Sequence, residues 1–141
     1  MKAQRENGKV SKENNVTENK ELVLQLETQI SIANWIQFIG QTIEAINLSR
    51  IMLISEEVRE NANERHILLG AWLQSVGQFL IGIGVTQQIL VNEEAVATIK
   101  AQEITNFGDW IKTLGSTVVA EAGRQIIIEE KKELEPPILI Q

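Results

Sequence analysis

Apolar residues recur along most of this chain at three- and four-residue steps, the spacing of one face of an α-helix. The steps are clearest around three tryptophans, Trp35, Trp72 and Trp110. A large apolar residue stands three positions before each tryptophan and one, four and eight positions after it. The pattern predicts three amphipathic helices, and we expect their tryptophan faces to form the core. The opposite, polar faces hold Gln37, Gln41, Gln74, Gln78, Lys112 and Ser116.

The three tryptophans mark an internal repeat of about 37 residues. Each lies in a motif of the form small–x–Trp–aliphatic–Gln/Lys–x–aliphatic–Gly, which ends at Gly40, Gly77 or Gly115. A residue that favours the helix N-cap, followed by glutamate, precedes each tryptophan by 17 or 18 positions: Thr17, Ser55 and Asn92. We therefore expect an all-α, antiparallel helical bundle built from three repeat units, 17–54, 55–91 and 92–134.

Small residues form a second periodic pattern beside the first, at seven-residue steps. Glycine inside a helix costs about 1 kcal/mol relative to alanine, so its recurrence needs a physical reason. Close approach of helix backbones is the reason we favour, because a seven-residue period stays on one helix face. At Asn47 and Gly84 the alternative is a left-handed residue that ends a helix, which leaves open three long helices or a larger number of short ones. The positions are Ala33, Gly40 and Asn47; Gly70, Gly77 and Gly84; and Gly108, Gly115 and Ala122.

The two ends of the chain differ from the repeat region. Residues 1–16 are polar, with Val10 and Val16 their only branched apolar residues, so we expect a disordered tail that folding does not require. The same stretch lacks the apolar run of a secretory signal peptide, which favours the cytoplasm. Pro136 and Pro137 cannot continue a helix, so residues 135–141 are expected to form a separate C-terminal tail.

The segment Leu69–Gly84 resembles units of small, uncharacterised "repetitive" proteins of bacilli, which carry several Gly-Ala-Trp-Ile-Gln-Ala-Ile-Gly-type segments. The resemblance extends over all three units, although Ala33 and Asn47 stand where glycine is typical, and Asp109 and Lys112 also depart from the pattern. It implies a helical repeat fold and a bacterial, cytoplasmic setting. It implies no activity.

Composition and charge argue against several functions. The net charge of −6 disfavours binding to nucleic acid, and the absence of cysteine excludes disulfides and thiolate chemistry. The single histidine, His66, lies between charged neighbours in no metal-binding spacing, so we expect it to be solvated or to cap a helix. Glutamate pairs at the unit starts are better explained by the helix dipole than by acid–base catalysis. We expect no enzymatic activity, no cofactor and no metal.

A membrane role is the main alternative. Residues 67–92 carry no charged side chain, and the next charged residue is Glu93. The stretch is long enough to span a bilayer, and glycine-rich faces also occur in membrane helices. Four glutamines interrupt the stretch, however, and the sister units carry Glu44 or Asp109 at the corresponding places. We therefore favour a structural or protein-interaction protein, with a second copy or another protein as its partner, over a membrane-associated one. The tryptophans are interpreted as core residues, with a partner-binding stripe as their alternative role.

Overall fold

The computed structural model of the chain describes residues 2–91 and 94–134, with side chains from Asn15 onward. These residues form three long helices, α1 (Lys2–Ile54), α3 (Ala62–Leu90) and α4 (Ala95–Leu134), and one short helix, α2 (Glu56–Glu60). The predicted all-α class is confirmed. Of the two arrangements that the glycines left open, the structure has the one with few long helices.

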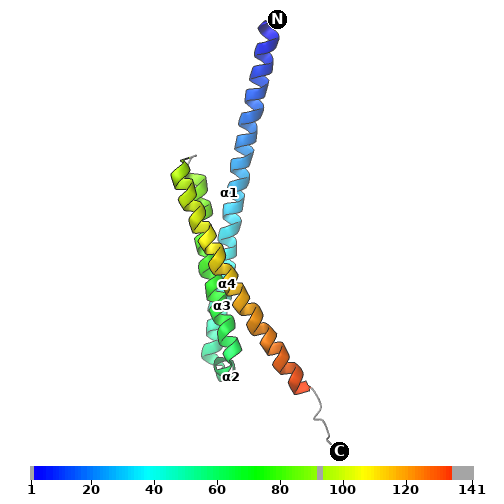
Figure 1. The fold of residues 1–141 in the computed structure, drawn as a ribbon, viewed down its shortest axis with the longest axis vertical. Helices are drawn as coiled ribbons and strands as arrows, with labels where there is room; N and C mark the ends of the chain where they lie inside the picture. Colours follow the sequence, from blue (N-terminus) through cyan, green and yellow to red (C-terminus); the bar gives the residue numbers. More distant parts are fainter. Residues whose placement is uncertain (1, 92–93, 135–141) are drawn as a thin grey trace, which may run out of the picture.

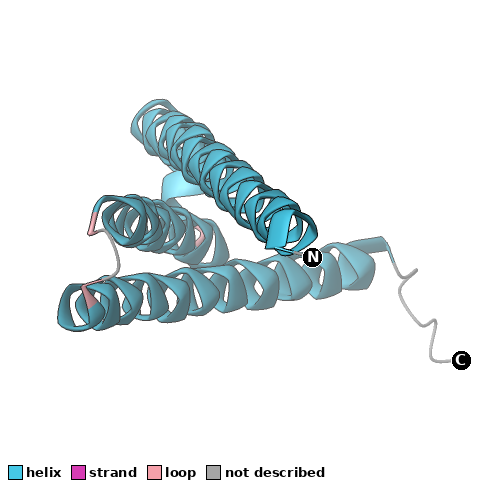
Figure 2. Cartoon of the chain, turned by 90° about the horizontal axis from the view of Figure 1, so that it is seen from above, coloured by secondary structure: helices cyan, strands magenta, loops and turns pink. Residues whose placement is uncertain are grey.

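Successive long helices run antiparallel, and α3 lies between the other two (Figures 1 and 2). Helix α3 packs along α4 on one side and along α1 on the other, whereas the backbones of α1 and α4 do not come into contact within the described part of the chain. Helix α2 turns the corner between α1 and α3. The three long helices therefore form an open layer. Helix α3 takes part in both of the extended helix–helix contacts.

Polar caps explain the break between α1 and α3. The Ser55 hydroxyl accepts the Val58 N–H at 3.4 Å and begins α2, as the sequence predicts. Asn61, which the repeat pattern did not single out, begins α3 by accepting the N–H groups of Asn63 and Glu64 at 2.8 and 3.3 Å. Between Ile54 and Ala62, α1 ends, α2 begins and ends, and α3 begins. These two helix breaks let the chain reverse its direction.

The predicted helix start at Thr17 is wrong, because this residue lies inside α1. No proline or glycine pair stops the helix upstream, and α1 extends back to Lys2, where the sequence led us to expect a disordered tail over residues 1–16. From Asn15 to Lys20 the side chains are exposed, so this end of α1 projects beyond the packed layer. Asn92 and the expected C-terminal tail, 135–141, lie outside the described residues.

Small residues, rather than large ones, fill the contacts between helices. Among the residues whose side chains are described, the buried apolar ones are four alanines and one isoleucine: Ala45, Ala71, Ala101, Ala122 and Ile81. Many large apolar side chains of the described residues stay exposed to solvent instead.

Candidate interaction surface

The contact between α3 and α4 is made by backbone against backbone at the glycines. A methyl group added at Gly77 would lie 2.5 Å from the Lys112 amide nitrogen and 2.6 Å from the Gly108 carbonyl oxygen. One added at Gly70 would lie 2.7 Å from the Gly115 carbonyl oxygen. These distances are possible only because no side chain separates the helices, so the predicted close approach is confirmed.

Gly84 belongs to the same contact. It lies inside α3 rather than at a helix end, and a methyl group there would meet the Ala101 carbonyl oxygen at 2.7 Å as well as the Thr105 hydroxyl. The alternative interpretation of Gly84 as a helix terminator is therefore wrong. The facing pairs, Gly70 with Gly115, Gly77 with Gly108 and Gly84 with Ala101, follow an antiparallel register at seven-residue steps.

Gly40, the corresponding glycine of α1, faces open space. No atom lies within 4 Å of the place where its Cβ would stand. Helix α1 instead packs on α3 through its other side, where Ser31 and Thr42 form hydroxyl contacts of 2.9 and 2.8 Å with Thr86 and Ser75. Of the three sequence-predicted glycines, the structure thus places two in a helix contact and leaves one exposed.

The three tryptophans occupy different environments. Trp35 is half-buried between α1 and α3, where its indole N–H donates to the Thr86 hydroxyl at 3.0 Å and its ring meets Phe79 edge-on at 5.9 Å. Trp72 is 40% exposed, and Trp110 is 69% exposed. The expectation of equivalent, largely buried tryptophans is wrong, because close backbone packing at the glycines leaves no space between α3 and α4 for large rings.

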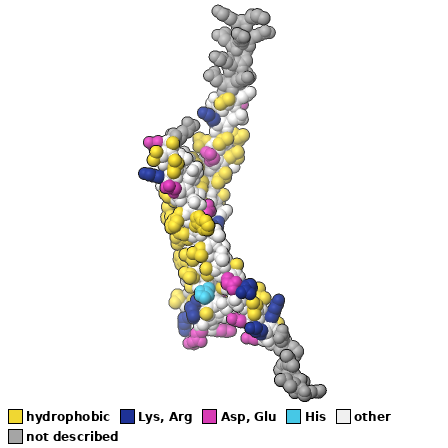
Figure 3. All heavy atoms as spheres, in the orientation of Figure 1, with side chains coloured by type: hydrophobic (Ala, Val, Ile, Leu, Met, Phe, Trp, Pro, Cys, Tyr) yellow, Lys and Arg dark blue, Asp and Glu magenta, His cyan; other side chains and the backbone are white. Residues whose placement is uncertain are grey.

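Most of the large apolar residues of the tryptophan faces point outward. On α1, Ile32, Ile36, Ile39 and Ile43 are between 54% and 64% exposed. Helices α3 and α4 show the same at Leu69, Val76, Phe107 and Leu114. Apolar side chains cover much of the visible middle of the molecule, and charged ones gather near its ends (Figure 3). The predicted core face is therefore, in large part, surface.

One residue of the predicted polar faces, Gln78, lies inside the helix contacts, whereas Gln37 and Ser116 stay exposed. Gln78 is fully buried. Its amide donates to the carbonyl and side-chain oxygens of Asn34 at 3.2 and 3.0 Å, and its own oxygen accepts from Lys112 Nζ at 2.6 Å. This network joins side chains of all three long helices. The prediction that Gln78 lies on the polar face opposite the core is wrong, and the hydrogen bonds compensate the cost of burying its amide.

The described titratable groups form no arrangement suited to catalysis. His66 is exposed, as expected. Glu121 of α4 accepts two bonds from Arg124 at 2.7 and 2.9 Å, which together with a bond from Gln125 lower the pKa of this carboxyl to about 2. A carboxylate that stays ionised to such low pH is a poor proton donor. Within residues 2–91 and 94–134, no group of three or more histidines and carboxylates could hold a metal ion.

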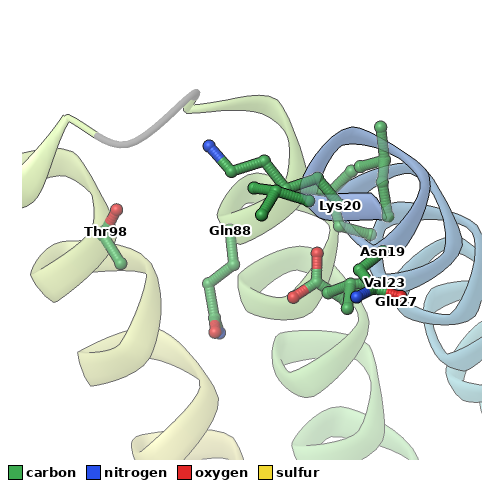
Figure 4. A pocket seen from close by; sticks show the side chains of 9 residues that line it. Asn19, Lys20, Val23, Glu27, Gln88 and Thr98 are labelled. Carbon is green, nitrogen blue, oxygen red and sulfur yellow. The ribbon is translucent and has the colours of Figure 1, made fainter. Parts of the chain in front are cut away.

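A hollow of about 660 Å³ lies where α1 diverges from α3 and α4 (Figure 4). Lys20 and Glu27 of α1, Gln88 of α3 and Thr98 of α4 contribute its polar side chains, and Val16, Val23, Leu24 and Ile89 its apolar ones. The described lining combines one cation, one carboxylate, uncharged polar groups and apolar groups, and the Thr98 hydroxyl bonds to the Glu94 carbonyl oxygen rather than to a base of the hollow. The extended apolar surface, not this hollow, is therefore the candidate functional site.

No family model, curated protein or solved structure matches the chain. The resemblance to repetitive proteins of bacilli stays a prediction.

Proposed function

We propose that this chain is a non-enzymatic structural protein that acts by assembling with other polypeptides through its exposed apolar helix faces. The observation that carries the proposal is the outward orientation of its large apolar side chains. Contiguous apolar surface of more than a few hundred Å² is rare on soluble monomers and marks sites of interaction. Here, exposed large apolar residues lie on all three long helices.

We further propose that the fold is a repeat architecture of three tryptophan- and glycine-marked units. The helix ends at Ile54, Leu90 and Leu134 support this division, because they fall at or beside the predicted unit ends. Units of this kind cannot each bury an apolar face alone, and stacking on equivalent units buries it. The repeat design therefore agrees with a role in assembly, which we expect to be exercised in the cytoplasm.

A membrane-associated protein is the second candidate. Helix α3 is long and apolar enough to cross a bilayer, with a mean hydropathy of 1.5 over an 18-residue window that is 44% buried. Small residues inside and large apolar residues outside are also typical of membrane helix bundles. Against this, Glu44 of α1 and Asp109 of α4 are exposed at levels beside the uncharged middle of α3. An exposed carboxylate at such a depth is costly in hydrocarbon.

Fractionation without detergent separates the two candidates. The expressed full chain is centrifuged at high speed, with a known soluble protein and a known integral membrane protein as markers, and the supernatant is analysed by light scattering after size exclusion. Assembly predicts a soluble species with a mass above 15.8 kDa. Recovery only in the membrane pellet, with flotation on vesicles of anionic phospholipid, would favour the membrane role. A soluble monomer that carries no other polypeptide would refute assembly.

A further inference from the structure

Helix α1 presents the same face that α3 and α4 use to pack on each other, and none of the described residues of the chain covers it. The face centres on the seven-residue series Ala33, Gly40 and Asn47, which stands at the same distances from Trp35 as the glycines of α3 and α4 stand from their tryptophans. On α3 and α4 the glycines of this series are buried and in backbone contact. On α1 all three positions are exposed.

The residues that flank the series show the same contrast. One and eight positions after each tryptophan, α3 has Leu73 and Leu80, and α4 has Ile111 and Val118, all of them half-buried. The corresponding residues of α1, Ile36 and Ile43, are 64% and 54% exposed. Two of three like faces are therefore closed within the chain, and the third lacks a partner.

We propose that this face of α1 pairs with the same face of α1 in a second copy of the chain, in the antiparallel manner of the α3–α4 contact. The inference rests on the proposed function and names the partner. Because each of the three faces can pair with another of its kind, the α3–α4 contact uses two of them and leaves the α1 face unpaired. In a two-fold symmetric dimer, the α1 faces of the two copies pair with each other. The symmetry axis passes beside Gly40, which places Ala33 of one copy beside Asn47 of the other.

The side chains around this axis are compatible with such a pairing. Ile36 and Ile43 lie on one edge of the face and meet Ile43 and Ile36 of the second copy, which buries apolar area now exposed. Gln37 and Glu44 lie on the other edge, so the amide of Gln37 comes beside the carboxylate of Glu44 of the second copy. The two glutamates remain about 12 Å apart along the helices, beyond a Debye length at physiological salt.

A cation also lies on that edge. Lys112 Nζ of α4 is 3.5 Å from Gln37 Oε1 in the single chain. The approaching carboxylate of the second copy therefore meets a positive charge, while the face itself carries no other charged residue between Ala33 and Asn47. A standard dimer interface needs about 800 Å² from each partner, and the exposed side chains of Ile36 and Ile43 contribute apolar area toward it.

Two leucine substitutions test the pairing. Gly40 and Gly123 both lie inside helices with no atom near the place of a Cβ, so leucine fits at either position in the single chain. Gly40→Leu places a large side chain where two backbones are to meet, whereas Gly123→Leu is the matched control on α4. We expect wild type and Gly123→Leu to sediment with twice the chain mass and Gly40→Leu to dissociate at least tenfold more readily. Far-UV circular dichroism verifies that all three keep their helix content.

Cysteine cross-linking gives the orientation, because the natural chain has no cysteine. Under mild oxidation, Gly40→Cys should form a disulfide-linked dimer, while Asp109→Cys, exposed on α4, should not. Ala33→Cys and Asn47→Cys should each fail to cross-link alone and should cross-link when mixed. Efficient cross-linking of Ala33→Cys with itself would instead indicate a parallel pair and overturn the antiparallel arrangement.

The possible outcomes separate this inference from the proposed function. If Gly40→Leu stays as oligomeric as wild type and Gly40→Cys does not cross-link, the α1 pairing is wrong, and assembly through another apolar face stands. If wild type is a monomer, the α1 pairing is wrong as well. In that case, the absence of any other bound polypeptide would refute the proposed function too.

Discussion

Substitution of Gly77 by alanine tests the backbone packing of α3 on α4 most directly. The added methyl group would stand 2.5 Å from the Lys112 amide nitrogen and 2.6 Å from the Gly108 carbonyl oxygen, where ordinary contacts begin at 3.4 Å. Both opposing atoms belong to the backbone, so relief requires the helices to separate by about 1 Å, which costs about 1–3 kcal/mol of unfolding free energy. Alanine's higher helix propensity offsets about 1 kcal/mol of this. We expect a net loss of up to about 2 kcal/mol.

Gly123→Ala is the matched control, because Gly123 lies in α4 with nothing within 4 Å of its Cβ position. There the propensity gain is unopposed, and the free energy of unfolding should rise by about 0.5–1 kcal/mol. Urea unfolding followed by circular dichroism, with linear extrapolation and equal protein concentrations, measures both changes. If Gly77→Ala stabilises the protein as much as Gly123→Ala does, α3 and α4 do not pack backbone against backbone.

Four further predictions follow from individual side chains. Gly84→Ala should lower the free energy of unfolding by about 1–2 kcal/mol in the same urea assay, because its Cβ would strike the backbone of α4. Trp35→Ala, which removes a half-buried ring and its hydrogen bond, should cost about 3 kcal/mol, whereas Trp110→Ala, 69% exposed, should cost less than about 1 kcal/mol in thermal melts at low concentration. Gln78→Ala should cost about 1–3 kcal/mol by urea unfolding, because it leaves buried partners without hydrogen bonds. The pKa of Glu121 is lowered from 4.5 to about 2, so its carboxylate should stay ionised and keep its hydrogen bonds until the pH falls through 2. An NMR titration of the side-chain carboxyl measures this, and a titration midpoint near pH 4.5 would contradict it.

The sequence contained enough information to predict the helices and their close contact. Glycine is unfavourable within a helix, so its recurrence at Gly70, Gly77 and Gly84 could be interpreted as a packing requirement. That interpretation is confirmed by the distances between α3 and α4. Ser55 was likewise predictable as a cap, because serine favours the N-cap and two glutamates follow it in the first helical turn.

The positions of the large side chains were not predictable in the same way. A helical projection shows that Trp110 and Leu114 share a face, but assigning that face to the core assumes that large apolar residues fill helix contacts. Where two backbones meet at glycine, no space remains for such residues, and they lie beside or away from the contact. The projection likewise gave no signal that Gln78 is buried, because its partners, Asn34 and Lys112, belong to other helices.

The glycine contact also determines which changes the sequence can accept in the course of evolution. Side chains in an ordinary core compensate for one another, so a larger residue at one site can be matched by a smaller one nearby. The carbonyl oxygen of Gly108 and the amide nitrogen of Lys112 belong to the backbone and cannot be made smaller. A single inserted residue inside α3 would turn the positions beyond it by about 100° and break the register. Chains that descend from a common ancestor with this one should therefore keep small residues at seven-residue intervals in α3 and α4, while their outward-facing isoleucines, leucines and valines interchange freely.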